Sequence, residues 1–275
     1  MGQQTRRTVF FVSDRTGITV ETLGRALLTQ FEGVEFRQIA LPFIDTEAKA
    51  RAAVERIDAS AAEEGAAPLV FSTQVRPELR SIVAAGRGVY LDFFEAFLAP
   101  LEDALERPST HSIGRSHGQQ DTLRYDTRID AVNFALGSDD GVGTQNYAGA
   151  DVIVIGVSRS GKTPTCLYLA MQYGVRAANY PFTEDDLETL RLPEILRAHR
   201  ERLVGLTIGP ERLRQIRQER RPDSTYSSLR QCQYEVRQLE ALLRREQIPM
   251  LDSTHMSIEE IAASIVYERG LVRRR

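Results

Sequence analysis

The chain contains little cysteine, no long hydrophobic run and no large excess of charge of one sign. Two cysteines, Cys166 and Cys232, are too few for a disulfide framework, and they do not indicate a zinc site. No apolar stretch approaches the length of a membrane span, and the basic start at Arg6 and Arg7 leads into a strand-length run rather than a signal-peptide core. We therefore expect a cytoplasmic protein without a membrane segment.

The composition is that of an ordinary folded protein. The formal net charge is −3 at pH 7 and the isoelectric point is about 5.9, so bulk electrostatics do not favour nucleic-acid binding. Hydrophobic residues make up 42% and charged residues 27%, which is enough for a core and a solvated surface. The length of 275 residues fits one large or two modest domains.

The sequence does contain a phosphate-loop pattern, G-x-x-x-x-G-K-[ST]. Its residues are Gly156, Val157, Ser158, Arg159, Ser160, Gly161, Lys162 and Thr163. The β-branched run 151–155 before it predicts a buried parallel strand, and 165–173 after it predicts a helix. In this context backbone N–H groups can hold a phosphate, Lys162 can neutralise it, and Thr163 can reach a metal ion. A coincidental glycine-bearing turn is the alternative.

The pattern of this region occurs a second time, earlier in the chain. A strand-like run at 8–12 is followed by a loop at 13–19 and a helix-like stretch to Leu28. In this arrangement Arg15-Thr-Gly-Ile-Thr19 corresponds to Arg159-Ser-Gly-Lys-Thr163. Three more matches follow in the same order: 36–43 with 175–182, 69–78 with 203–211, and 89–92 with 249–252. They predict an α/β protein of two similar phosphate-loop-like units with mainly parallel sheets. Chance similarity between two strand–helix alternations is the alternative.

The first of the two loops lacks the functional residues of the second. Ile18 stands in the place of the lysine and Val12 in the place of the first glycine, so we expect a binding or structural role there. A turn-rich stretch at 137–146 predicts the boundary, with domains 1–136 and 137–275. A polar stretch at 108–118 with two histidines fits a surface loop and a functional loop equally well.

Phosphoryl transfer to a hydroxyl also needs a carboxylate that accepts the proton. The candidates are Asp92, Asp139, Asp140 and Asp252, and spacing alone does not choose between them. A group of arginines is suited either to clamp a phosphate or to form a solvated helix face: Arg212, Arg214, Arg217, Arg220 and Arg221. The metal is left open, with Mg²⁺ as the candidate.

The run Gly-Val-Ser-Arg-Ser-Gly-Lys-Thr-Pro-Thr at 156–165 resembles the signature of the phosphoenolpyruvate synthase regulatory proteins, relatives of the pyruvate, phosphate dikinase regulatory proteins. The resemblance covers nearly the whole chain, through 12–24, 134–141, 168–174, 178–181, 205–207 and 257–261. The chain departs from the family pattern at Arg15, where a small residue is expected, and at Gly137, where some relatives have a basic residue.

The resemblance implies a bifunctional serine/threonine kinase and phosphorylase that forms a homodimer. Such a protein inactivates its partner, phosphoenolpyruvate synthase, by transferring phosphate from ADP to a threonine and releasing AMP. It reactivates the synthase by attack of inorganic phosphate, releasing diphosphate. The resemblance places residues 156–163 on the ADP β-phosphate or the attacking phosphate, and assigns Lys162 as the catalytic charge and Asp140 as the base.

Two other functions fit the phosphate loop. A small-molecule phosphate-loop kinase would have a compact acceptor pocket beside Lys162, whereas a protein kinase would have an open cleft there. A non-catalytic nucleotide-sensing module would bind ADP and transfer nothing.

Overall fold

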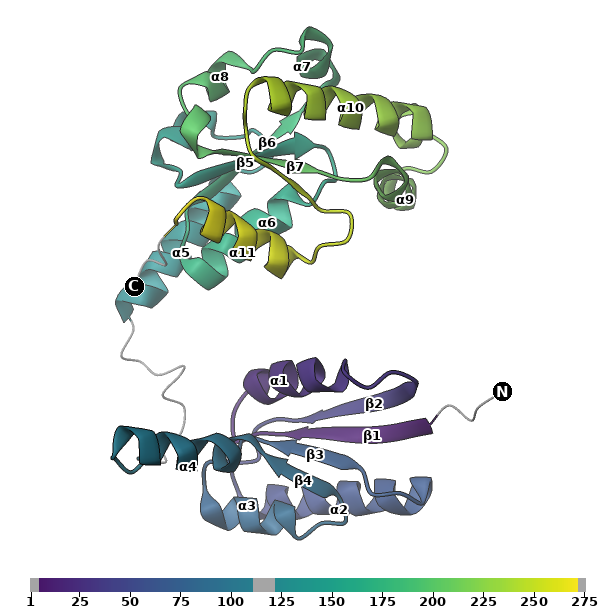
Figure 1. Cartoon of the computed structure of the whole chain (residues 1–275), viewed down its shortest axis with the longest axis vertical. Coiled ribbons are helices and arrows are strands. Elements are labelled where there is room, and N and C mark those ends of the chain that lie inside the picture. Colours follow the sequence, from purple (N-terminus) through teal and green to yellow (C-terminus); the bar gives the residue numbers. More distant parts are fainter. Residues whose placement is uncertain (1–4, 111–121, 272–275) are drawn as a thin grey trace. The chain divides into compact units, whose positions relative to one another are not determined.

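A computed structural model describes residues 5–110 and 122–271 of the chain. The chain divides into two compact units, Met1–Gly118 and Gln119–Arg275, each built on a four-stranded parallel sheet with helices on both faces (Figure 1). The predicted fold class of two similar parallel α/β units is confirmed. Among the described residues, none of the helices has the length and apolar character needed to span a membrane. Residues 111–118 of the histidine-containing stretch lie outside the described residues.

The first unit has the strand order β2-β1-β3-β4. Its strands are β1 (Thr5–Val12), β2 (Val34–Leu41), β3 (Leu69–Ser72) and β4 (Val89–Asp92), and its helices are α1 (Ile18–Leu28), α2 (Glu47–Glu64), α3 (Pro77–Ala84) and α4 (Phe93–Leu105). Side chains of β1 alternate between two cores, as a pleated strand requires. Phe10 and Val12 pack with residues of α2 and α3, whereas Val9 and Phe11 pack with residues of α1 and with Phe93.

The second unit repeats this topology with the strand order β6-β5-β7-β8. Its strands are β5 (Val152–Val157), β6 (Ala177–Phe182), β7 (Leu203–Thr207) and β8 (Met250–Asp252). The register agrees with the sequence match between 69–78 and 203–211. Phe10 pairs with Val70 in the first sheet, and Val154 pairs with Val204 in the second.

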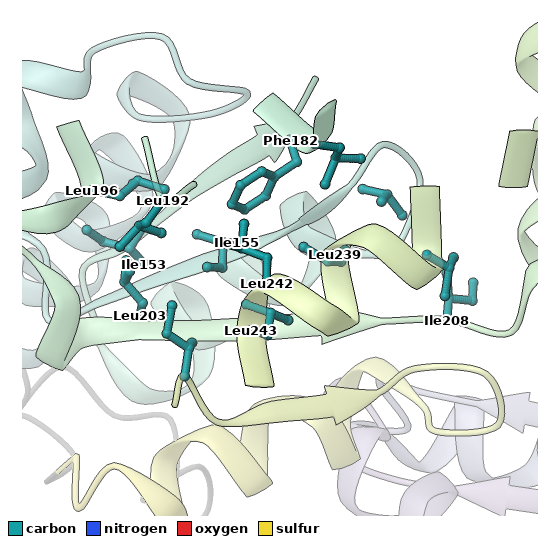
Figure 2. Close-up of a cluster of buried hydrophobic side chains, with 14 of the residues drawn as sticks. Ile153, Ile155, Phe182, Leu192, Leu196, Leu203, Ile208, Leu239, Leu242 and Leu243 are labelled. Atoms are coloured by element: carbon teal, nitrogen blue, oxygen red, sulfur yellow. The ribbon is translucent and has the colours of Figure 1, made fainter. Parts of the chain in front are cut away.

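Helices cover both faces of the second sheet (Figure 1). They are α5 (Thr122–Gly137), α6 (Lys162–Tyr168), α7 (Glu184–Thr189), α8 (Glu194–Arg197), α9 (Pro210–Arg220), α10 (Leu229–Arg245) and α11 (Ile258–Glu268). Short turns of other helix types are η3 (Thr144–Gly149), η5 (Arg200–Arg202), η6 (Thr225–Ser227) and the π-helical η4 (Leu169–Tyr173), which directly continues α6. Ile153 and Ile155 pack with residues of α7 to α10 (Figure 2), whereas Val152 and Val154 pack with α5, α6 and α11.

The predicted domain boundary at 136/137 is wrong, because α5 is part of the second unit. Ala131 and Ala135 of α5 are buried in the same core as Val152 and Val154 of β5. The turn-rich stretch at 137–146 is therefore a connection inside the second unit. The two units divide earlier, between α4 and α5.

The topology determines where the second unit can hold a ligand. All four strands are parallel, so their carboxyl ends lie along one edge of the sheet. After β6 the chain crosses to the other side of β5 to form β7, which makes the carboxyl ends of β5 and β7 a topological switch point. Ligands of open α/β sheets bind in the crevice at such a point. The phosphate loop begins there.

We predict that Ala135→Arg destabilises the second unit by about 3–5 kcal/mol, since it places an unpaired charge in the core. Leu136→Arg is the matched control, because this neighbouring side chain is 58% exposed. Denaturant unfolding of the full chain, followed by circular dichroism, measures both. Equal stability of the two variants would show that α5 does not belong to this core.

Candidate functional site

The phosphate loop connects β5 to α6 and packs closely against β7. A Cβ on Gly156 would lie 2.5 Å from the carbonyl oxygen of Leu206 and 2.8 Å from Ser160 Oγ, so only glycine fits at this position. Gly161 has φ 95°, in the left-handed region that favours glycine. Both glycines of the pattern are thus required by the backbone, the first by close approach and the second by conformation.

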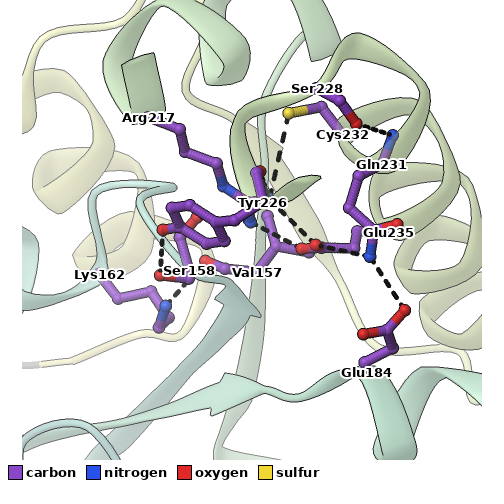
Figure 3. Close-up of polar contacts among 10 residues, drawn as sticks. All are labelled: Val157, Ser158, Lys162, Glu184, Arg217, Tyr226, Ser228, Gln231, Cys232 and Glu235. Carbon is purple, nitrogen blue, oxygen red and sulfur yellow. Dashed lines mark hydrogen bonds and ion pairs between the residues drawn. The ribbon is translucent and has the colours of Figure 1, made fainter. Parts of the chain in front are cut away.

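Lys162 is the buried cation of the loop. The residue is 4% exposed, and its Nζ donates to the carbonyl oxygen of Val157 at 2.9 Å (Figure 3). Burial lowers the pKa of Lys162 to about 8, and among its charged neighbours Asp140 opposes that shift most strongly. The negative charge of Asp140 therefore favours the protonated form of Lys162.

The Asp139-Asp140-Gly141 turn is fastened to β6 by Asn179. The buried Asn179 side chain accepts from the backbone N–H of Asp140 at 2.9 Å and donates to Asp139 Oδ1 at 2.5 Å. Asp140 has φ 48° and Gly141 has φ 75°, so two consecutive residues adopt the left-handed conformation. This geometry turns the chain sharply after α5 and leaves Asp140 exposed at the edge of the sheet.

Asp139 also contacts the phosphate loop. Thr163 Oγ1 donates to Asp139 Oδ1 at 2.7 Å. A hydroxyl and a carboxylate in contact form a set of hard oxygen donors of the kind that Mg²⁺ uses together with phosphate oxygens. Asp139 and Asp140 thus contact different parts of the loop, the first at Thr163 and the second through its charge on Lys162.

The other two acidic candidates have local hydrogen-bond partners. Asp92 belongs to the first unit, where Oδ1 caps α4 by accepting from the backbone N–H groups of Phe94 and Glu95. Asp252 is exposed and accepts from the backbone N–H of Thr254, as a turn residue does. Of the four candidate carboxylates, Asp139 is the one that a hydrogen bond among the described residues joins to the phosphate loop, at Thr163.

A buried ion pair contacts the phosphate loop at Ser158. Arg217 of α9 is fully buried and contacts Glu235 of α10 through both terminal nitrogens, at 2.6 and 3.0 Å (Figure 3). It also donates to the carbonyl oxygen of Ser158 at 3.1 Å and lies 4.1 Å from the ring centroid of Tyr226. Burial lowers the pKa of Arg217, but the hydrogen bonds and charge of Glu235 outweigh this and leave the pKa above its usual value.

Sequence reasoning missed the structural roles of Arg217 and Asn179. The other four arginines of the group are exposed, as a solvated helix face predicts, but Arg217 is neither solvated nor free to clamp a phosphate. Its position four residues after the buried Leu213 was the available signal. For Asn179, the signal was an amide side chain inside the mostly apolar strand Ala177–Phe182.

The corresponding loop of the first unit has different chemistry. Asp14 is buried, its Oδ2 has no hydrogen-bond partner within 5–110 and 122–271, and burial raises the pKa of the carboxyl group. Ile18, which replaces the lysine, is 60% exposed. The backbone N–H groups of Phe43 and Ile44 donate to carbonyl oxygens of this loop. An acidic loop without a lysine is poorly suited to a phosphate, in agreement with the absence of the full pattern from this part of the sequence.

Comparison with known proteins assigns the class of the whole chain. The sequence profile of the kinase/pyrophosphorylase family matches residues 9–266, so the chain belongs to that family. A protein of Halorhodospira halophila is 58% identical over 269 residues, which cover 98% of each chain. A protein of Ectopseudomonas mendocina is 54% identical over 269 residues, covering 98% of this chain and 99% of its own. Both relatives bear the provisional name phosphoenolpyruvate synthase regulatory protein. Family membership supports a phosphotransferase role.

We predict that Asp140→Asn lowers the pKa of Lys162 below about 8, because it removes the nearby charge that most favours the ammonium form. Asp139→Asn should lower it less. The chain contains only two lysines, Lys49 and Lys162, so NMR titration of the side-chain Nζ signals can follow the pKa directly. An unchanged Lys162 titration in Asp140→Asn would contradict the placement of Asp140 beside the loop.

Proposed function

We propose that the protein is a bifunctional serine/threonine kinase and phosphorylase that regulates phosphoenolpyruvate synthase. In one direction it transfers the β-phosphate of ADP to a threonine of the synthase and inactivates it. In the other direction it uses inorganic phosphate to remove that group, releases diphosphate and restores activity. Membership of the kinase/pyrophosphorylase family and the names of the full-length relatives support this assignment.

The observation that carries the proposal is the meeting of three groups at the end of β5. The Lys162 ammonium, the Thr163 hydroxyl and the Asp139–Asp140 turn lie together although the turn and the loop come from different elements. A phosphate loop alone indicates only a phosphate ligand. A carboxylate held beside it adds a proton acceptor, which transfer to a hydroxyl requires.

In the kinase direction, the threonine oxygen attacks the β-phosphorus of ADP. A new P–O bond forms to threonine, the bond from the β-phosphorus to the bridging oxygen breaks, and AMP leaves with the electron pair. Asp140 accepts the threonine proton, for which its exposed position is suited. Lys162 stabilises the charge on the transferred group, and such electrostatic positioning supplies most of the catalysis in phosphoryl transfer.

In the phosphorylase direction, an oxygen of inorganic phosphate attacks the phosphothreonine phosphorus. The bond to the threonine oxygen breaks, the new bond gives diphosphate, and Asp140 returns the proton to the threonine oxygen. One carboxylate thus serves as the base of the kinase reaction and as the acid of the phosphorylase reaction. The phosphate loop has the same task in both directions, because ADP and inorganic phosphate each present one phosphoryl group to it.

A Mg²⁺ ion fits the hard oxygen donors of Thr163 and Asp139, and would neutralise phosphate charge there. No group of three or more His, Cys, Asp or Glu side chains in the described part of the chain is arranged to hold a metal by itself. This agrees with the usual Mg²⁺ site of phosphoryl transfer, in which substrate oxygens and water complete the shell.

The exposure of Asp140 favours a protein substrate over a small one. A small-molecule kinase needs its base inside a compact acceptor pocket, whereas Asp140 lies on a surface turn that a protein segment can approach. A nucleotide sensor would need the phosphate loop alone, and the carboxylates fastened beside it would have no task.

We expect Lys162→Ala to abolish both activities while the fold persists, because one charge serves the ADP and the inorganic-phosphate complexes. Transfer of radiolabel from β-labelled ADP to purified phosphoenolpyruvate synthase measures the first activity, and phosphate-dependent release of diphosphate measures the second. Lys49→Ala, which changes the only other lysine, is the control. Loss of one direction alone would contradict a shared site.

Asp140→Asn should lower transfer by at least the roughly 10²-fold typical of a lost acid–base group and, at a pH low enough to keep Lys162 protonated, leave ADP affinity intact. The affinity persists because the side chain contacts the acceptor hydroxyl rather than the nucleotide. Single-turnover transfer and calorimetric titration with ADP separate the two effects. Asp130→Asn on the exposed face of α5 is the matched control. If Asp140→Asn transferred phosphate normally and lost only stability, the turn would have a structural role alone.

A further inference from the structure

A cavity adjoins the phosphate loop on the side away from the Asp139–Asp140 turn. It has a volume of about 520 Å³, within the range of small-molecule sites. Arg159, Gly161 and Pro164 line it from the loop and the start of α6. The start of α9 and the segment 253–258, which leads from β8 into α11, form the other walls.

The two sides of the phosphate loop are not equally open. On the β6 side, Asp139 contacts Thr163, Asn179 fills the junction, and a Cβ on Gly141 would lie 3.7 Å from the ring of Tyr180. On the β7 and β8 side lies the cavity. The cavity therefore offers room for a larger group attached to a phosphate that is bound in the loop.

The lining of the cavity fits a nucleoside with a further phosphate. Ile208, Ile261 and Met256 supply apolar surface, and the charged or titratable side chains that line it are Arg159, Arg212 and His255. Among the described residues, none of those that line it is acidic. An apolar pocket with a few cationic and hydroxyl groups is typical of sites that bind an aromatic base and an attached phosphate.

The cavity wall is tied directly to the phosphate loop. Ser253 Oγ donates to the carbonyl oxygen of Ser160 at 3.0 Å, and the backbone N–H of Gly209 donates to Thr254 Oγ1 at 2.7 Å. Ser257 then caps α11 and forms a reciprocal pair of hydrogen bonds with Glu260. These bonds join the ends of β7 and β8 to the loop, so the cavity has a fixed position relative to Lys162.

We propose that this cavity binds the adenosine and α-phosphate of the nucleotide donor, and that the side of the Asp139–Asp140 turn receives the acceptor threonine. The inference rests on the proposed function and divides its site into two parts. Inorganic phosphate has no nucleoside, so the phosphorylase reaction uses the loop and the acidic turn without the cavity. Changes in the cavity wall therefore separate two activities that changes in the loop remove together.

Two variants test this division. Ile258→Asp places a negative charge in the cavity wall at the first position of α11, where an acidic residue is favourable for the helix. Arg212→Ala removes a cation from an exposed position of α9 that lines the cavity. Arg214→Ala, exposed on the same helix, is the matched control.

For both cavity variants we expect the KM for ADP in the kinase reaction to rise about 10- to 100-fold, as for a lost group in a substrate pocket. The KM for inorganic phosphate in the phosphorylase reaction should not change. A parallel rise of both constants, or an unchanged KM for ADP, would overturn the inference. The proposed function is tested separately by Lys162→Ala: if that variant retains both activities the function itself is wrong, whereas failure of the cavity variants alone refutes only the placement of the nucleoside.

Discussion

The side chain of Asn179 uses both ends of its amide to join the acidic turn to the second sheet. Its oxygen accepts from Asp140 and its nitrogen donates to Asp139, whose carboxylate in turn accepts from Thr163. A buried amide left without partners costs about 1–3 kcal/mol, so the structure strongly favours this one arrangement. The position of the carboxylates, the orientation of the Thr163 hydroxyl and the charge next to Lys162 all depend on it.

The Arg217–Glu235 pair likewise holds the phosphate loop in place, through the carbonyl oxygen of Ser158. Arginine is suited to this task because its planar fork can bind a carboxylate with two nitrogens and still donate to the Ser158 and Tyr226 carbonyl oxygens. Tyr226 in turn contacts Ser158 through the two hydroxyl groups at 2.9 Å. Buried ion pairs often add little net stability, so we infer that this one matters for position: it fixes the phosphate loop relative to α9 and α10.

The two units show how one topology supports different sites. Both sheets have the order 2-1-3-4, and both have a loop and a helix after the first strand. In the second unit the loop carries Gly156 against β7 and a buried lysine, whereas the first unit has a buried Asp14 and an exposed Ile18. The two units share one strand order, but the chemistry depends on a few residues at the carboxyl ends of the strands, as is general for folds of this class.

The sequence by itself determined the phosphate loop, the strand before it, the helix after it and the repeated unit. Each of these depends on neighbouring residues or on a periodic apolar pattern, which a linear sequence displays directly. Only the tertiary structure showed that Asp139 contacts Thr163 of the phosphate loop, that α5 belongs to the second unit, and that Arg217 is buried. These depend on contacts between distant residues, such as Thr163 with Asp139 across 24 positions, Arg217 with Ser158 across 59, and Ser253 with Ser160 across 93. Local propensity carries no information about such pairs, because they form only when separate strands end at the same edge of one sheet.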